Sequence, residues 1–171
     1  MPGHVRILGF DPGTRVAGYG VIDAGPGGEL SVVSYGAIHL QKTGEKLDIP
    51  IRLRKLYEAL DEIVREHGPA VLALEKVFHG RSFESVMKVG EARGVGLLVG
   101  ALHDLKIAEY APTRVKKVVT GNGQASKSQV QKMMARLLNL DEPPDPPDVT
   151  DALALAFCYA QRLRRPDLST S

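Results

Sequence analysis

The sequence has few of the residues that build disulfide scaffolds or zinc sites. Its 171 residues include one cysteine, Cys158, which cannot form a disulfide within the chain. Because Cys158 lies in an apolar stretch with a helical pattern, we expect a buried structural thiol rather than a nucleophile. The five histidines show no paired spacing of the kind that binds zinc. A disulfide-stapled domain and a zinc centre of paired residues are therefore excluded.

Long hydrophobic runs, internal repeats and low-complexity segments are also missing. The apolar run GVGLLVGAL at residues 94–102 is too short to span a bilayer, and no basic and apolar leader opens the chain. With 43% hydrophobic residues, the chain can bury one substantial core but has little room for two domains. We expect one cytoplasmic domain, away from membranes, over residues 1–171, with a short flexible tail from about residue 165.

Two carboxylates stand where expected strands end. The short apolar runs at residues 5–10 and 70–74 are typical of buried strands. Asp11 follows the first run and Glu75 follows the second. Because side chains at the carboxyl ends of strands face the ligand crevice in open α/β sheets, both acids are candidate site residues.

Two further acids mark the start of a C-terminal helix. Asp148 follows two prolines and precedes an apolar-rich stretch, so we expect it to be the N-cap. Asp151 is three residues on, which puts both carboxylates on one face of the first turn. Taken singly, an acid at such a position more often belongs to a turn, caps a helix or is simply solvated than binds a metal. If the fold brings all four together, their repulsion has to be relieved by cations or protons, and magnesium is the natural candidate.

Charge is unevenly distributed, although the net charge is only +2. Residues 112–136 contain six basic and no acidic residues, and residues 137–151 contain five acidic and no basic residues. Such neighbouring blocks suit a phosphodiester nuclease, because cations position the nucleic acid backbone while carboxylates hold metals. Gly121 and Gly123 lack the spacing of a Walker A loop. They predict a flexible loop that lets Lys127 reach a phosphate from the next helix start.

The hydrophobic patterns predict an α/β fold. Strands are expected at residues 5–10, 18–23, 30–40, 70–74 and 107–110, with a glycine-rich turn at 25–28. Helices are expected at residues 49–67 and 82–105, and three more begin near residues 113, 126 and 149. Three strands in hairpin succession, followed by alternating helices and strands, indicate a mixed sheet with helices on its faces.

Five longer stretches carry a resemblance to a known family. They are DPGTRVAGYG at 11–20, LEKVF at 74–78, KVGEARGVG at 88–96, APTRVKKVVTGNGQASKSQV at 111–130 and DVTDALALA at 148–156. In this order and at this spacing they resemble the RuvC family of Holliday-junction resolvases, over nearly the whole chain. The resemblance implies an RNase H-like fold with helices on both faces of a mixed sheet. It also implies a homodimer that resolves four-way DNA junctions by paired symmetric nicks in recombination and repair, with the RuvAB branch-migration complex as a further candidate partner.

The resemblance also implies roles for individual residues. Catalysis and two magnesium ions per subunit, replaceable by manganese, are assigned to Asp11, Glu75, Asp148 and Asp151. Contacts to DNA are assigned to Phe78, Arg81, Lys116 and Lys127. Phe78 would stack on unpaired bases, and Lys127 would also act in catalysis by neutralising charge on the phosphate. Asp145 is an alternative to Asp148, which we prefer because of its helical offset from Asp151.

The helix expected at residues 82–105 carries two pairs of glycines at four-residue spacing, Gly90 with Gly94 and Gly96 with Gly100. Small residues permit close packing, either against the sheet or against a second subunit. Because this helix directly follows the region of Glu75, it is the candidate dimer interface. Bulky substitution at Gly96 or Gly100 is then expected to weaken dimerisation.

Three alternatives stay open. An actin-type or hexokinase-type phosphotransferase also has an Asp-x-Gly turn after its first strand, but it needs a second lobe that 171 residues hardly provide. A related nuclease with other DNA or RNA substrates would share the fold. A catalytically inert junction-binding module is the non-enzyme alternative, and the complete set of four carboxylates disfavours it.

Overall fold

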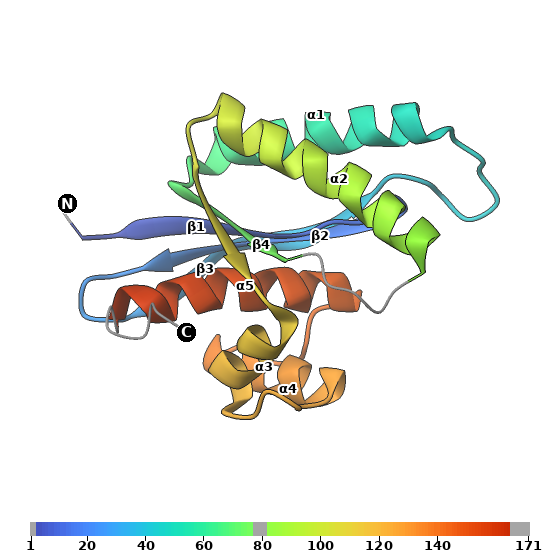
Figure 1. Ribbon diagram of the computed structural model, residues 1–171. Helices are drawn as coiled ribbons and strands as arrows, with labels where there is room; N and C mark the ends of the chain where they lie inside the picture. Colours follow the sequence, from blue (N-terminus) through green and yellow to red (C-terminus); the bar gives the residue numbers. More distant parts are fainter. Residues whose placement is uncertain (1–2, 77–81, 165–171) are drawn as a thin grey trace.

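A computed structural model describes residues 3–76 and 82–164, which form a five-stranded sheet between helices (Figure 1). The strands are β1 (Val5–Asp11), β2 (Val16–Ala24), β3 (Leu30–His39), β4 (Val71–Glu75) and β5 (Lys106–Tyr110). The helices are α1 (Ile49–His67), α2 (Phe83–Leu102), α3 (Pro112–Thr120), α4 (Lys127–Leu137) and α5 (Pro147–Arg164). The strand order is β3-β2-β1-β4-β5. The first three strands are antiparallel, whereas β4 and β5 run parallel to β1, so the predicted mixed sheet is confirmed.

Helices cover both faces of the sheet. In Figure 1, α1 and α2 lie on one face and α5 on the other, with α3 and α4 packed outside α5. Successive side chains of a strand point to opposite faces. On β1, Phe10 belongs to the core with α1 and α2, whereas Ile7 belongs to the core with α5. On β4, Leu74 and Ala73 divide in the same way.

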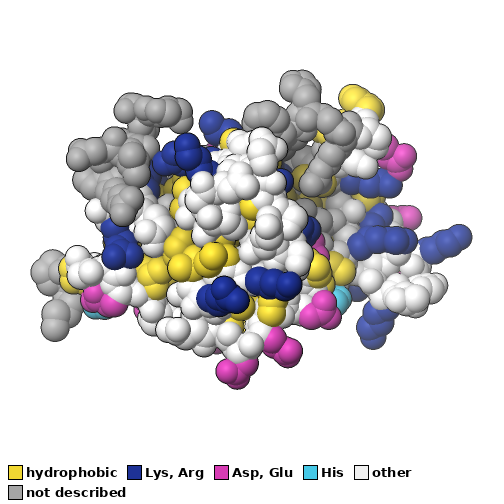
Figure 2. Space-filling view, turned by 90° about the horizontal axis from the view of Figure 1, so that it is seen from below, with side chains coloured by type: hydrophobic (Ala, Val, Ile, Leu, Met, Phe, Trp, Pro, Cys, Tyr) yellow, Lys and Arg dark blue, Asp and Glu magenta, His cyan; other side chains and the backbone are white. Residues whose placement is uncertain are grey.

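The basic block of the sequence falls mainly on the two outer helices. Residues 112–136 cover α3 and nearly all of α4, and the acidic block begins at the end of α4. Figure 2 looks onto this side of the molecule, where Lys and Arg side chains surround hydrophobic ones with Asp and Glu among them. The positive charge is therefore spread over this face rather than gathered in one patch.

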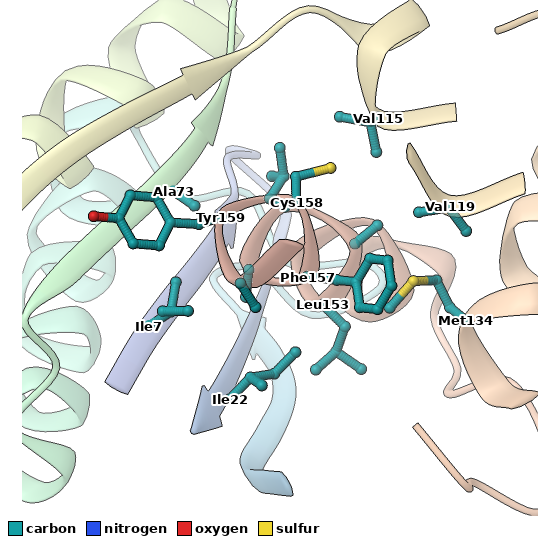
Figure 3. Close-up of a cluster of buried hydrophobic side chains, with 14 of the residues drawn as sticks. Ile7, Ile22, Ala73, Val115, Val119, Met134, Leu153, Phe157, Cys158 and Tyr159 are labelled. Carbon is teal, nitrogen blue, oxygen red and sulfur yellow. The ribbon is translucent and has the colours of Figure 1, made fainter. Parts of the chain in front are cut away.

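Helix α5 is buried between the sheet and the outer helices. From Val149 to Ala160 every residue except Asp151 is buried. Figure 3 shows the surrounding side chains, which come from the sheet on one side and from α3 and α4 on the other. The labelled ones are Ile7, Ile22 and Ala73 from the sheet, and Val115, Val119 and Met134 from the outer helices. Because one helix packs against both layers, its position is fixed from two sides.

Cys158 belongs to this core. Burial raises the pKa of its thiol to about 12, against the small opposing influence of Arg114. A thiol that stays protonated is a poor nucleophile. The expected structural role of Cys158 is confirmed in its burial.

Glycines on β1 and β2 let α5 lie directly on the sheet. A Cβ atom at Gly9 would overlap the carbonyl oxygen of Ala152, and one at Gly18 would overlap that of Asp148. Both obstacles are backbone atoms, which cannot rotate away as a side chain can. The absence of side chains at Gly9 and Gly18 thus sets how closely the first turns of α5 approach the sheet.

The start of α5 and the end of α2 differ from expectation. Helix α5 begins at Pro147, so Asp148 lies inside the first turn and the prediction that it is the N-cap is wrong. Proline is well tolerated in the first turn, because the N–H that it lacks would have no partner there. Helix α2 ends at Leu102 rather than near residue 105, since Asp104 adopts a left-handed conformation with φ of 56°.

None of the helices within the described residues is both long and apolar enough to cross a membrane. The tail expected from about residue 165 lies outside the described residues.

We predict that Gly18→Ala lowers the free energy of unfolding by about 3 kcal/mol or prevents folding, because its Cβ meets backbone. Gly20→Ala is the matched control on the same face of β2. Its Cβ would lie 2.5 Å from Leu153 Cδ2 but no closer than 3.2 Å to backbone, so we expect a smaller loss, of about 1 kcal/mol. Urea denaturation measures both. Equal losses would contradict the role assigned to the backbone contact.

Candidate active site

The predicted strand-end carboxylates lie on the same face of the sheet. Asp11 is the last residue of β1 and Glu75 the last residue of β4. These strands are parallel neighbours, and Phe10 pairs with Leu74 one residue earlier. Since Phe10 and Leu74 face α1 and α2, alternation turns Asp11 and Glu75 towards α5.

The first turns of α5 bring the other two carboxylates to this place. Gly18 pairs with Asp11 across β1 and β2, and the backbone of Asp148 lies against Gly18. Asp151 follows one turn later on the same helix. The charges of Asp151, Asp148 and Glu75 all act on the carboxyl group of Asp11. The structure therefore brings together the four acids that the sequence singled out.

Crowding has a clear electrostatic effect on Asp11. Burial, followed by the negative charges of the other three acids and a hydrogen bond with Asp148, raises the pKa of Asp11 to about 8. In the absence of a metal ion, Asp11 therefore carries a proton at neutral pH. Among the described residues, the acids of this cluster outnumber the one basic side chain paired with them, Lys127, and an excess of carboxylates favours binding of a cation.

Lys127 supplies one positive charge. Its Nζ atom lies 2.9 Å from Oδ2 of Asp151, and this ion pair joins the start of α4 to α5. Burial lowers the pKa of Lys127, but its hydrogen bond and charge interaction with Asp151, together with Asp11 and Asp148, raise it overall. The ammonium group therefore stays charged beside the acids.

Hydrogen bonds organise the loop before Lys127. Gly121 ends α3 in a left-handed conformation with φ of 81°, and Asn122 Oδ1 accepts a bond from the Gln124 N–H at 2.9 Å. Ser126 and Gln129 then form a reciprocal capping box at the start of α4. The expected flexible loop is instead a sequence of bonded turns, which places Lys127 at the first residue of a capped helix.

Of the other predicted site residues, some lie within the described part of the chain and some do not. Asp145 is exposed, whereas Asp148 bonds to Asp11, so the geometry favours Asp148 as the neighbour of Asp11. Lys116 lies in α3, where its carbonyl oxygen accepts a bond from Thr120 Oγ1 at 2.7 Å. Its contact with DNA stays a prediction. The predicted DNA contacts Phe78 and Arg81 lie outside the described residues.

The donor atoms suit a hard divalent cation. Carboxylate oxygens are the ligands that magnesium and calcium prefer, and the pKa of Asp11 is raised first by burial and then by the negative charge of the other three acids. Within the described residues, however, no group of three or more His, Cys, Asp or Glu side chains is arranged to hold a metal ion. The side chains present fit a metal in chemistry, but they have to move closer together to bind one.

Sequence reasoning missed one residue at this edge of the sheet. Arg93, on α2, donates from Nε to the carbonyl oxygen of Glu75 at 3.4 Å and from Nη2 to the Glu109 carboxylate. The stretch KVGEARGVG contains this arginine. Its position in a helix did not reveal that it turns towards the ends of β4 and β5.

Comparison with known proteins identifies the family. The family model described as "Crossover junction endodeoxyribonuclease RuvC" matches residues 7–159. The chain belongs to the RuvC family. The RuvC of Alkaliphilus metalliredigens is 45% identical over 154 residues, which cover 90% of this chain and 92% of that protein. That of Desulforamulus reducens is 43% identical over 155 residues, or 91% and 93% of the two chains.

Solved RuvC structures have the same architecture. The Thermus thermophilus RuvC in complex with Holliday junction substrate matches with a TM-score of 0.85 and 27% identity, covering 95% of this chain and 96% of that one. The yeast mitochondrial Holliday junction resolvase Ydc2 matches with a TM-score of 0.70 and 13% identity, covering 96% and 81%, which supports the fold alone. The fold of this RuvC-family chain is RNase H-like, as the resemblance implied. Membership of this nuclease family also indicates dependence on a divalent metal.

We predict that the metal-free protein loses stability as the pH rises. The folded-state pKa of Asp11, about 8, lies above the unfolded value, so the folded protein holds this proton more tightly. Its contribution is full at low pH and is lost as the pH rises through about 8. Asp11→Asn should flatten this dependence and raise stability at about pH 9 by roughly 1 to 3 kcal/mol. Urea denaturation with a chelator measures the effect.

Asp104→Asn is the control for this experiment. Asp104 is exposed and lies in the turn after α2, in a left-handed conformation that asparagine also adopts readily. Its substitution should leave the pH dependence as in the unsubstituted protein. An Asp11→Asn protein with the original pH dependence would contradict the assigned electrostatics.

Proposed function

We propose that this RuvC-family chain is a magnesium-dependent endonuclease that resolves Holliday junctions by paired symmetric nicks. The observation that carries the proposal is the meeting of four carboxylates from β1, β4 and α5, with the Lys127 ammonium 2.9 Å from Asp151. Hydrolysis of a phosphodiester needs both kinds of charge at one place, because acids hold metal ions and a cation stabilises the phosphate. One domain, with its single carboxylate cluster, would form each catalytic unit.

The four acids would hold two magnesium ions, for which manganese can substitute. Bound ions of this kind activate a water molecule and stabilise the leaving oxygen. The part played by the chain follows from its electrostatics. Burial, followed by the charges of the three neighbouring acids, raises the pKa of Asp11, so a cation held beside it would favour the deprotonated carboxylate, with the proton passing to solvent. Asp151 becomes available as a ligand when the ion pair with Lys127 opens.

Besides its ion pair with Asp151, Lys127 would also act on the phosphate. Its long side chain starts from the capped first residue of α4, so the head group can move while the helix stays in place. Released from Asp151, the ammonium neutralises charge that accumulates on the phosphate. Lys116 would contribute to holding the DNA backbone. We propose the same for Arg81, and base stacking for Phe78.

The substrate proposal draws on the Thermus relative, whose structure is a complex with Holliday junction substrate. Two alternatives make different predictions for a substrate panel of four-way junction, linear duplex and single strand. A related nuclease would cut another substrate faster than the junction. An inert junction-binding module would bind the junction and cut nothing. We further propose that the chain acts in the cytoplasm and that RuvAB is a partner.

We predict that Asp11→Asn, Glu75→Gln and Asp151→Asn each lower the nicking rate by about a thousandfold or more, since each removes a charged metal ligand. Junction binding should be unchanged or tighter, because phosphates then meet less negative charge. Lys127→Ala should lower the rate by about a hundredfold and binding far less. The exposed Lys132, one turn further along α4, is the control and should be nearly silent when changed to alanine.

Nicking is measured on a labelled four-way junction with and without magnesium, and binding by filter retention in calcium. Near-normal cleavage by the Asp11→Asn protein would contradict the assignment of Asp11 to the metal site. Equal losses for Lys127→Ala and Lys132→Ala would indicate a diffuse electrostatic surface instead.

The proposed homodimer is supported by the solvent face of α2. Phe83, Met87, Leu98 and Leu102 are exposed by 82%, 50%, 52% and 58%. Helical spacing places them in one stripe, and Gly90 and Gly94 in the same stripe have open space where a Cβ would be. Monomeric proteins rarely leave such an apolar stripe in water. A four-way junction has two equivalent strands to cut, so two copies related by a twofold axis suit it.

The glycines expected at the dimer interface divide between the two faces of α2. A Cβ at Gly96 would lie 2.7 Å from Phe10 Cε1, and one at Gly100 2.7 Å from Ile107 Cδ1. Both glycines therefore pack inward on the sheet, and bulky side chains there would disturb the core. Substitution of Gly96 or Gly100 therefore does not test the dimer interface as we expected. The outward-facing residues of α2 test it instead.

We predict that Leu98→Glu and Leu102→Glu convert the dimer to a monomer, because each places a charge in the apolar stripe. Sedimentation velocity measures the change, and circular dichroism checks the fold. Val33→Glu, at a position exposed by 37% on β3, is the matched control and should leave the dimer intact. On a cruciform plasmid the two leucine variants should make single, unpaired nicks. A monomeric parent protein that still makes paired nicks would refute this assembly.

A further inference from the structure

Arg93 connects α2 to the two strand ends beside the carboxylate cluster. Nε and Nη2 lie on one edge of its planar guanidinium group. Nε donates to the Glu75 carbonyl oxygen at 3.4 Å, and Nη2 donates to the Glu109 carboxylate. The Arg93 side chain is 17% exposed and that of Glu109 is 38% exposed, so the guanidinium is mostly buried while its carboxylate partner is partly in water. One side chain therefore holds together a helix and two parallel strands.

The sheet register explains why Glu109 is available to Arg93. Leu74 of β4 pairs with Glu109 of β5, so both side chains point to the α2 face. Glu75 and its partner Tyr110 point to the opposite face, towards α5. Arg93 thus approaches Glu75 from behind. It binds the backbone of a residue whose carboxylate belongs to the site on the other side of the sheet.

The inward glycines of α2 make this approach possible. Gly96 and Gly100 follow Arg93 by three and seven residues, and they lie against Phe10, Leu72 and Ile107. Without side chains at these two positions, the helix lies close over β4 and β5. The arginine stem can then reach the ends of the strands.

The backbone around Glu75 is fixed on both sides. The N–H of Lys76 donates to the Tyr110 carbonyl oxygen at 2.9 Å, which extends the β4–β5 ladder one residue beyond Glu75. The Glu75 carbonyl oxygen is bound by Arg93. A peptide unit held at both its oxygen and its nitrogen cannot easily rotate, so the backbone position from which the Glu75 side chain extends is restrained before any ligand arrives.

We propose that Arg93, anchored by Glu109, is a positioning residue that aims the Glu75 carboxylate at the metal site. The inference rests on the proposed function, because it assumes that Glu75 is a metal ligand. A wrongly aimed carboxylate binds metal more weakly, whereas a merely structural ion pair would change stability and leave metal affinity alone. The two roles are therefore separated by magnesium dependence.

The test uses Arg93→Lys, which keeps the charge but cannot bridge two acceptors with one planar edge. Magnesium is titrated in two assays, nicking of a four-way junction and thermal stabilisation of the DNA-free protein. We expect the magnesium concentration at the midpoint to rise about tenfold in both, with a less than about threefold loss of rate at saturating magnesium. Glu109→Gln should shift the midpoints in the same direction. The double variant should be no worse than Arg93→Lys alone, because both act through one contact.

Arg65→Lys is the matched control. Arg65 Nε lies 2.7 Å from Asp61 Oδ2 on α1, in an arginine–carboxylate pair that does not contact the strand ends. Unchanged midpoints for Arg93→Lys, or an equal shift for Arg65→Lys, would overturn the proposal. If the parent protein bound magnesium but cut no junction, and Arg93→Lys still raised the midpoint of stabilisation, the positioning role would stand and the proposed nuclease function would fail.

Discussion

The contact between α5 and the glycines of the sheet is the interaction on which the candidate site depends. Two of the four acids come from strand ends and two from a helix, and side chains as short as aspartate meet only if the backbones are close. Gly18 brings this about, since it pairs with Asp11 within the sheet and lies against the backbone of Asp148 in α5. Local backbone packing thus sets the spacing between charges.

The buried helix also carries the electrostatic cost of the site. Burying Asp11 and surrounding it with three more carboxylates opposes folding, and both effects, burial first, raise the pKa of Asp11. Helix α5 offsets that cost by packing against the sheet and against α3 and α4, with Asp151 the sole residue between Val149 and Ala160 that is not buried. The ion pair between Asp151 and Lys127 adds a local charge balance. The turns of α5 that carry the acids are therefore also turns that anchor the helix in the core.

Patterns along the chain predicted the elements and the four acids, because strand alternation and turn residues are local signals. The boundary of α5 was predicted two residues late, since the two adjacent prolines leave the first helical residue ambiguous. The orientation of α2 could not be predicted. Spacing places Gly94 and Gly96 on one helix, but only packing shows that Gly96 meets Phe10 while Gly94 faces open space. The contacts of Arg93 could not be predicted for the same reason, because its two acceptors lie on β4 and β5, outside its own helix.

The alternation of side chains along β1 also determines where the chain can change in length. One residue inserted before Asp11 within the strand would turn that carboxylate to the α2 face and remove it from the cluster. The same holds for Glu75 on β4. The connection at residues 40–48, between β3 and α1, has no such strict alternation of side chains. Extra residues there would lower the free energy of unfolding only a little. Length variation among sequences of this fold should therefore fall in such connections, while β1 and β4 keep a constant count of residues.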